Sequence, residues 1–209
     1  MDKKFLIFDM DGTLVDSMIY WKNLAAEYLK SKGVNEVSRE ILEKIKPMTM
    51  TESAELFIEE YALEGSGEDI AAEMNKCMDD HYCNDIPLKE GVAAYLKEQA
   101  EKGCVMCVAS ATAEHLMEAC LSRLGVRSYF KFLLSCEDVG SGKNQPDVYF
   151  ESAKRLGCIP SEAAVYEDAI YAAKTAGEAG FYVVGVYDES AKAHWSEMEE
   201  LADETIRRF

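Results

Sequence analysis

The chain has 209 residues, of which 48% are hydrophobic and 29% charged, and this ordinary globular balance argues against intrinsic disorder. Its formal net charge of −17 would repel phosphate backbones and anionic headgroups, so we expect neither nucleic acid nor a membrane as a partner. No stretch approaches the roughly 18 consecutive apolar residues that a transmembrane helix requires.

The N-terminus and the cysteines both favour a cytoplasmic protein. Residues 1–4 lead directly into a short apolar segment, without the long apolar stretch and small-residue cleavage site of a secretory signal. The seven cysteines are odd in number and scattered among apolar neighbours, which is typical of reduced thiols. We expect a monomer or a weak homo-oligomer.

The first element predicted along the chain is a short buried strand at residues 5–8, which ends in a polar turn at residues 9–13. Four helical stretches follow with no strand signal between them, at residues 17–32, 38–46, 51–61 and 68–82. The sequence therefore predicts an inserted helical cap domain at residues 17–82. The core domain would consist of residues 1–16 and 83–209.

Beyond the insert, a helix is predicted at residues 90–102, and short apolar runs then alternate with helix-length segments. These runs predict strands at residues 104–109, 132–136, 163–166 and 181–186, and residues 205–209 could add an edge strand. The alternation indicates an α/β fold with a Rossmann-like parallel sheet and right-handed crossovers. Cys104 and Cys107 would point to opposite faces of one strand, so we expect neither a shared metal nor a disulfide.

Polar side chains follow the predicted strands at their carboxyl ends, where open parallel sheets bind ligands. These residues are Asp9 and Asp11 after the first strand, Ser110 after the second, Lys143 in the loop after the third, and Glu167 and Asp168 after the fourth. We expect the chemistry at this edge of the sheet.

Two carboxylates separated by one residue at a strand end suit covalent catalysis. Asp9 would attack an electrophile, and Asp11 would give a proton to the leaving oxygen. Gly12 permits a tight turn that brings backbone amides near a phosphoryl group, and Thr13 could add a hydroxyl contact.

The remaining polar residues suit a metal ion and a phosphate group. Glu167 and Asp168 supply the hard oxygen ligands that Mg²⁺ prefers. Lys143 offers a compact positive charge for a phosphate oxygen, and Ser110 with the backbone at Ala111 could hold another oxygen. Each feature alone has an ordinary explanation: a turn at residues 9–12, a solvated loop lysine, or a helix cap supplied by Ser110 or Thr112.

Residues 8–17, Phe-Asp-Met-Asp-Gly-Thr-Leu-Val-Asp-Ser, resemble the first motif of haloacid-dehalogenase-superfamily phosphatases. Ser110, residues 142–149 and the pair Glu167-Asp168 resemble the second, third and fourth motifs, in the same order. The helical insert resembles the four-helix cap of the phosphoglycolate-phosphatase and β-phosphoglucomutase subfamily. Two departures are Asn144 where proline is usual and Ala169 where serine is common.

The resemblance implies hydrolysis of a small phosphorylated metabolite, with transient phosphorylation of Asp9. It also implies that Mg²⁺ is held by Asp9, the backbone carbonyl of Asp11 and Asp168, with Glu167 as a direct or indirect partner.

Within the cap, Tyr20 and Trp21 could contact the substrate, although an aromatic pair at the start of a helix is more often packing. Lys46 and Thr49 lie where this subfamily keeps a specificity loop.

Two alternatives to a phosphatase stay open. One is a sugar phosphomutase, although β-phosphoglucomutases carry a histidine in the first cap helix, where this chain has Tyr20-Trp21. The other is a non-catalytic phospho-receiver module, although such modules are shorter and lack a helical insert after the first strand.

Overall fold

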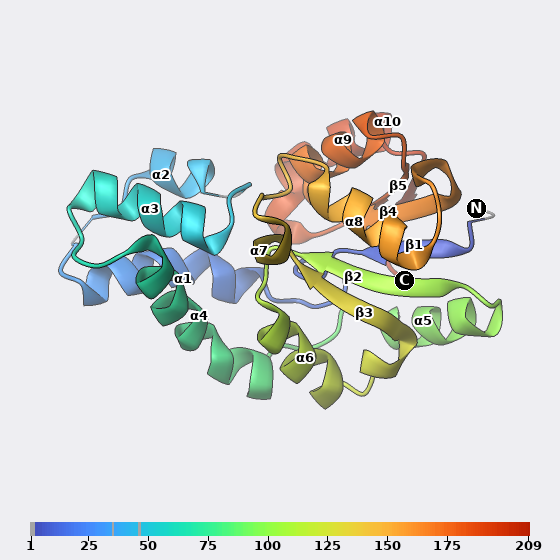
Figure 1. Cartoon of the computed structure of the whole chain (residues 1–209), viewed down its shortest axis with the longest axis horizontal. Helices are drawn as coiled ribbons and strands as arrows, with labels where there is room; N and C mark the ends of the chain where they lie inside the picture. Colours follow the sequence, from blue (N-terminus) through green and yellow to red (C-terminus); the bar gives the residue numbers. More distant parts are fainter. Residues whose placement is uncertain (1–2, 35, 46) are drawn as a thin grey trace.

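A computed structural model of the chain describes residues 3–34, 36–45 and 47–209. Figure 1 shows two lobes, one built only of helices and the other around a twisted sheet. The sheet has six strands in the order β3-β2-β1-β4-β5-β6, and all neighbouring pairs are parallel. The strands are β1 (Phe5–Phe8), β2 (Val105–Ser110), β3 (Phe130–Ser135), β4 (Ala163–Glu167), β5 (Tyr182–Val186) and β6 (Glu204–Ile206).

This arrangement confirms the predicted α/β fold, with β6 as the edge strand. Each crossover passes through helices, because parallel neighbours cannot be joined by a tight hairpin. The helices of this lobe are α5 (Val92–Glu101), α6 (Glu114–Arg123), α7 (Cys136–Val139), α8 (Asp147–Leu156), α9 (Ile170–Glu178) and α10 (Trp195–Leu201).

Alternating side chains of the strands divide the core between the two faces of the sheet. In β1, Leu6 and Phe8 join the cluster under α5 and α6, whereas Ile7 joins the cluster under α8, α9 and α10. In the same way Cys107 is buried on the α8 side while Cys104 packs on the other. The structure therefore confirms that these two cysteines lie apart.

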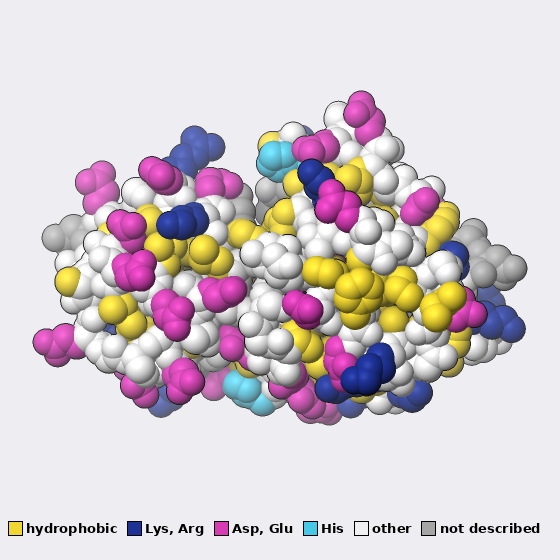
Figure 2. Space-filling model, turned by 45° about the horizontal axis from the view of Figure 1, so that its top comes forward, with side chains coloured by type: hydrophobic (Ala, Val, Ile, Leu, Met, Phe, Trp, Pro, Cys, Tyr) yellow, Lys and Arg dark blue, Asp and Glu magenta, His cyan; other side chains and the backbone are white. Residues whose placement is uncertain are grey.

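The helical lobe consists of α1 (Met18–Ser31), α2 (Arg39–Lys44), α3 (Met50–Tyr61) and α4 (Gly67–Asn84). Capping boxes begin two of its helices: Thr49 with Glu52 at α3, and Ser66 with Asp69 at α4. Acidic side chains are scattered over this lobe, and Lys and Arg do not gather into a basic patch on the face that Figure 2 shows.

The helical lobe enters and leaves the sheet lobe through two linkers that lie side by side. Val15 and Leu88 form an antiparallel bridge. On either side of it, the Asp16 amide donates to the Pro87 carbonyl and the Lys89 amide donates to the Leu14 carbonyl, each at 3.0 Å. Among the described helices, none is both long and apolar enough to cross a lipid bilayer.

Gly91, which follows the second linker and precedes α5, generates a stability prediction. It has a φ of +86°, and a Cβ there would overlap the backbone oxygen of Phe209. Gly91→Ala should therefore lower the free energy of unfolding by more than the ~1–2 kcal/mol of left-handed strain alone. Gly103→Ala is the matched control, since Gly103 has a φ of +79° and no atom within 4 Å of the added Cβ. If urea denaturation showed equal losses of unfolding free energy in Gly91→Ala and Gly103→Ala, the close contact between Gly91 and Phe209 would be contradicted.

Candidate active site

Four of the predicted residues lie together at the carboxyl ends of the strands, three placed by the strands and Lys143 by the loop between α7 and α8. Phe8 pairs with Tyr166, and the Asp9 amide donates to the Tyr166 carbonyl at 3.0 Å, so Asp9 lies beside Glu167. The four residues Asp9, Lys143, Glu167 and Asp168 are all at most 6% exposed. Ionisable side chains are rarely buried so deeply unless they are paired or bind a metal.

Lys143 forms ion pairs with two of these carboxylates. Its ammonium donates to Oδ1 of Asp9 and, at 2.7 Å, to Oε1 of Glu167. Tyr149, on the first turn of α8, donates its hydroxyl to the same Glu167 oxygen at 2.7 Å. Burial alone would lower the pKa of Lys143, but the charges of Asp9 and Glu167 outweigh it and raise that pKa well above its usual value. Lys143 is therefore a fixed positive charge.

Asp9 keeps one carboxylate oxygen free. Within the described residues, its Oδ2 is buried and has no hydrogen-bond partner. Burial raises the pKa of Asp9 to about 7, and the charge of Glu167 adds to this effect while Lys143 opposes it. A buried oxygen without a partner is costly, so this atom is available to a metal ion or to a phosphorus atom.

Asp9, Glu167 and Asp168 form a cluster, here called the carboxylate cluster, in which one oxygen from each residue lies within 4.8 Å of the others. When all three acids are ionised, they face the single Lys143 ammonium with two negative charges in excess, which matches a divalent cation. The pKa of Asp168 is raised well above its usual value by burial and by the charges of Asp9 and Glu167. Oxygen ligands without nitrogen or sulfur suit Mg²⁺, so these residues fit such an ion.

The turn after β1 packs tightly against the carboxylate cluster. Gly12 has a φ of +86°, and a Cβ there would overlap Oδ2 of Asp168, so only glycine lets the backbone come this close. The hydroxyl of Thr13 lies 3.3 Å from Oδ1 of Asp168. Both residues that we predicted for phosphate contact thus adjoin a candidate metal ligand.

Asp11 lies on the same turn, but its carboxylate is held by a different set of side chains. Ser17 and Tyr82 donate hydroxyls to its Oδ1 at 2.5 and 2.6 Å, and the Trp21 indole nitrogen lies 3.0 Å from the same oxygen. The Trp21 indole nitrogen also donates to the Tyr82 hydroxyl at 2.7 Å. The helical lobe therefore contacts Asp11 through both α1 and α4.

The other oxygen of Asp11 is held from the sheet lobe. Thr112 donates to Oδ2 at 2.5 Å, and the Ser110 hydroxyl lies 3.4 Å away. The alternative that Thr112 caps the following helix is wrong, because α6 begins after Ala113 without a side-chain cap. The Ser110 hydroxyl accepts from the Thr112 amide at 3.1 Å, and Ala111 between them is exposed.

The cap residues that we predicted to contact the substrate lie in different surroundings. The Tyr20 ring lies 4.5 Å from the His81 ring between α1 and α4, and the Thr49 side chain caps α3. Lys46 lies outside the described residues. Substrate contacts by Tyr20, Trp21 and Thr49 stay predictions.

The helical lobe also contacts the sheet lobe next to Lys143. Glu137 accepts hydrogen bonds from the amide and hydroxyl of Thr51, near the N-terminus of α3, at 3.3 and 3.1 Å. A carboxylate at this end of a helix is electrostatically favourable. A Cβ on Gly142 would overlap the Pro47 carbonyl, so this glycine permits the close contact.

Ser17, Tyr82 and Tyr149 also belong to the site, although we did not predict them from the sequence. Ser17 and Tyr149 are the last residues of the motifs at residues 8–17 and 142–149, and this position could have identified them as site residues. Tyr82 lies in the last turn of α4, and no local pattern marks it.

Comparisons with known proteins identify relatives along most of the chain. Residues 6–186 match the family described as haloacid dehalogenase-like hydrolase. Hexitol phosphatase B of Escherichia coli K12 is 27% identical over 165 residues, which cover 78% of this chain and 74% of that protein. The fructose-1-phosphate phosphatase YqaB of the same strain is 26% identical over 185 residues, which cover 87% of this chain and 95% of that protein.

A solved structure shares the fold. The β-phosphoglucomutase of Clostridium difficile superposes with a TM-score of 0.80 at 21% identity, over 99% of this chain and 91% of that one.

The charge imbalance of the carboxylate cluster predicts stabilisation by a divalent cation. Mg²⁺ at about a hundred times its dissociation constant should stabilise the fold by ~2.7 kcal/mol, raising Tm by several degrees. Asp168→Asn should remove most of this rise and also stabilise the metal-free protein, because burial beside Asp9 and Glu167 penalises an ionisable acid at this position and not an amide. Thermal melts with Mg²⁺ or excess chelator test both points. An unchanged Mg²⁺ response in the variant would exclude Asp168 as a ligand.

The raised pKa of Asp9 predicts a pH dependence of the metal-free protein. Its pKa rises from 3.8 to about 7 on folding, so the folded state binds more protons between these values. The free energy of unfolding should therefore fall as the pH rises through this window. Urea denaturation in chelator at about pH 5 and about pH 8 should show a smaller fall for Asp9→Asn than for wild type. If the free energy of unfolding fell equally in wild type and in Asp9→Asn, the pKa of Asp9 would not be raised in the folded protein.

Proposed function

This chain belongs to the haloacid dehalogenase-like hydrolase family, and we propose that it is a magnesium-dependent phosphatase of small phosphate monoesters. The observation that carries the proposal is the buried, unpartnered Oδ2 of Asp9, which lies in the carboxylate cluster beside the Lys143 ammonium. A nucleophile, a fixed positive charge and a metal-ligand set then occupy one place.

In the proposed reaction, Oδ2 of Asp9 attacks phosphorus as the bond between phosphorus and the ester oxygen breaks. Asp11 gives its proton to the departing alcohol, and Lys143 balances charge on Asp9 and on the phosphoryl group. When bound, Mg²⁺ supplies further charge neutralisation and orients the phosphate.

The second half of the reaction releases phosphate. Asp11, now ionised, accepts a proton from water, and the oxygen of that water attacks phosphorus. The bond between Asp9 and phosphorus breaks, which restores the Asp9 carboxylate and leaves Asp11 protonated for the next cycle.

We propose that the helical lobe is a cap that limits access of bulk water to the phosphorylated Asp9 formed in the first half of the reaction. The contacts of Thr51 with Glu137 and of Pro47 with Gly142 support this role, since they hold the lobe against the loop that carries Lys143. Tyr20, Trp21, Lys46 and Thr49 would supply substrate contacts from the cap.

The substrate class rests on the relatives, several of which are named for sugar or polyol phosphates. We propose a phosphorylated sugar, polyol or short organic acid. All seven cysteines are unpaired thiols, which supports a cytoplasmic location, and we propose a monomer or weak homo-oligomer.

A phosphomutase is the second candidate, because a β-phosphoglucomutase shares the fold. The surroundings of Asp11 favour the phosphatase: Trp21 contacts its carboxylate from the first cap helix, where β-phosphoglucomutases carry a histidine.

The decisive measurement is phosphate release from p-nitrophenyl phosphate and a panel of sugar, polyol and organic-acid monophosphates, with Mg²⁺ or with chelator. Wild type should turn over repeatedly only with the metal. Asp9→Asn should lower kcat by at least about a thousandfold, because it removes the nucleophile. The control is Asp80→Asn, an exposed residue of α4. Wild-type turnover by the Asp9 variant would refute the mechanism, and isomerisation of a sugar 1-phosphate without phosphate release would favour the mutase.

A further inference from the structure

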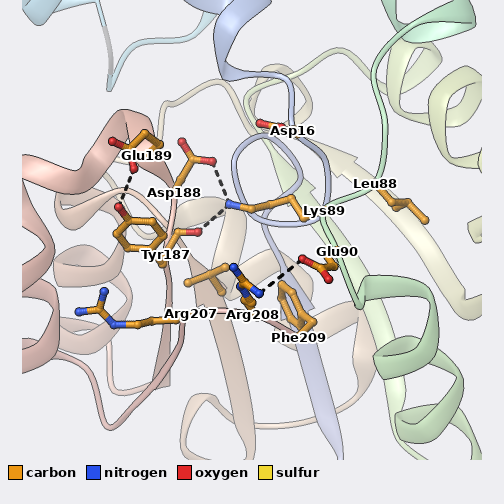
Figure 3. A pocket seen from close by; sticks show the side chains of 11 residues that line it. Asp16, Leu88, Lys89, Glu90, Tyr187, Asp188, Glu189, Arg207, Arg208 and Phe209 are labelled. Carbon is orange, nitrogen blue, oxygen red and sulfur yellow. Dashed lines mark hydrogen bonds and ion pairs between the residues drawn. The ribbon is translucent and has the colours of Figure 1, made fainter.

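A hollow adjoins the turn after β1 (residues 9–13, here called the catalytic turn), on the side of the linker that leaves the helical lobe. This cavity of about 260 Å³ is bordered by residues 88–90, the end of β5 and residues 207–209 (Figure 3). Lys89 extends across it toward Tyr187 and Asp188, and its side chain is only 17% exposed. The proposed reaction gives this half-buried cation no role.

Three acceptors surround the Lys89 ammonium, one for each of its N–H groups. It donates to the Gly12 carbonyl at 2.5 Å, to the Tyr187 carbonyl at 2.7 Å and to Oδ2 of Asp188 at 2.8 Å. An ammonium has only three donors. Lys89 is therefore fully committed to the protein, which makes it a poor candidate for binding a ligand.

Of these acceptors, the Gly12 carbonyl connects Lys89 with the reaction. Gly12 packs so closely on Asp168 that a Cβ would overlap its Oδ2, and Gly12 lies next to Asp11 in the chain. A displacement of this carbonyl would move the backbone that lies between Asp9 and Thr13. Lys89 thus fixes the turn at a point where it contacts the carboxylate cluster.

The Asp188 contact is separable from this one. Oδ1 of Asp188 accepts from the amide and hydroxyl of Ser190 at 2.9 and 2.6 Å, so Asp188 stays hydrogen-bonded without Lys89. Asp188→Asn removes the ion pair while it leaves the Lys89 donors to both carbonyls.

We propose that Lys89 is a positioning residue for the reaction: its ammonium holds the Gly12 carbonyl, and with it the catalytic turn, in the geometry needed for attack by Asp9. Lys89 belongs to the linker that leaves the helical lobe, and its amide donates to the Leu14 carbonyl. The linker and the turn are therefore held together at this residue. The kinetic consequence rests on the proposed phosphatase function, whereas the effect on the turn does not.

The test compares Lys89→Met with Asp188→Asn and with Lys97→Met, which removes the same charge from a 68% exposed side chain. For p-nitrophenyl phosphate with saturating Mg²⁺, Lys89→Met should lower kcat by about tenfold to a hundredfold and change KM by less than about threefold. Asp188→Asn and Lys97→Met should stay within about threefold of wild type in both constants. Mg²⁺ should still raise the Tm of Lys89→Met, which separates misplacement of the turn from loss of the metal.

Hydrogen exchange provides a readout that needs no activity. Exchange in residues 9–15 should accelerate in Lys89→Met but not in Asp188→Asn, because only the former frees the Gly12 carbonyl. If Lys89→Met does not fold, Lys89→Leu, which likewise lacks donors and charge, is measured in the same way. Unchanged exchange in residues 9–15, a kcat within about twofold of wild type, or a loss confined to KM would each overturn the proposal. Failure of the proposed function would instead appear in wild type, which would release no phosphate.

Discussion

One buried ammonium supports the whole arrangement at the carboxyl ends of the strands. Lys143 lies between Asp9 and Glu167, and Asp168 completes a set of three carboxylates that this single charge cannot balance. Burying unpaired charge is expensive, and removal of the Lys143 ammonium would leave Asp9 and Glu167 without their cation, which usually costs more than the ion pairs themselves contribute. The site is therefore suited to an additional cation. The same excess of buried negative charge would lower the stability of the metal-free protein and favour the binding of a metal ion.

The two aspartates of the first turn differ through their surroundings. Asp9 faces Lys143 and the other acids with one oxygen unoccupied, whereas hydroxyls of Ser17, Tyr82 and Thr112 surround Asp11. A nucleophile needs a free oxygen and charge compensation, while a group that exchanges protons needs to be held without being neutralised by a cation. These different environments match the two roles that we propose for the neighbouring carboxylates.

The positions of the strands along the chain and of the four motifs could be predicted from the sequence because both are local signals. A buried strand is a short apolar run, and residues such as Asp9 and Glu167 directly follow one. Tyr82 and Lys89 could not be found in this way, since each reaches the site from a linker or helix end whose position depends on tertiary packing. Ordinary loop lysines are exposed, and nothing in the neighbourhood of Lys89 distinguishes it from them.

The paired linkers have a consequence for how this molecule can change. Because Val15 and Leu88 lie side by side, the point where the chain departs from the sheet lobe is also the point where it returns. A segment inserted there can lengthen, shorten or be exchanged for another without shifting the pairing of any strand. Substrate preference and bond-breaking chemistry can accordingly diverge at separate rates, with the helices as the replaceable part and the sheet as the constant one.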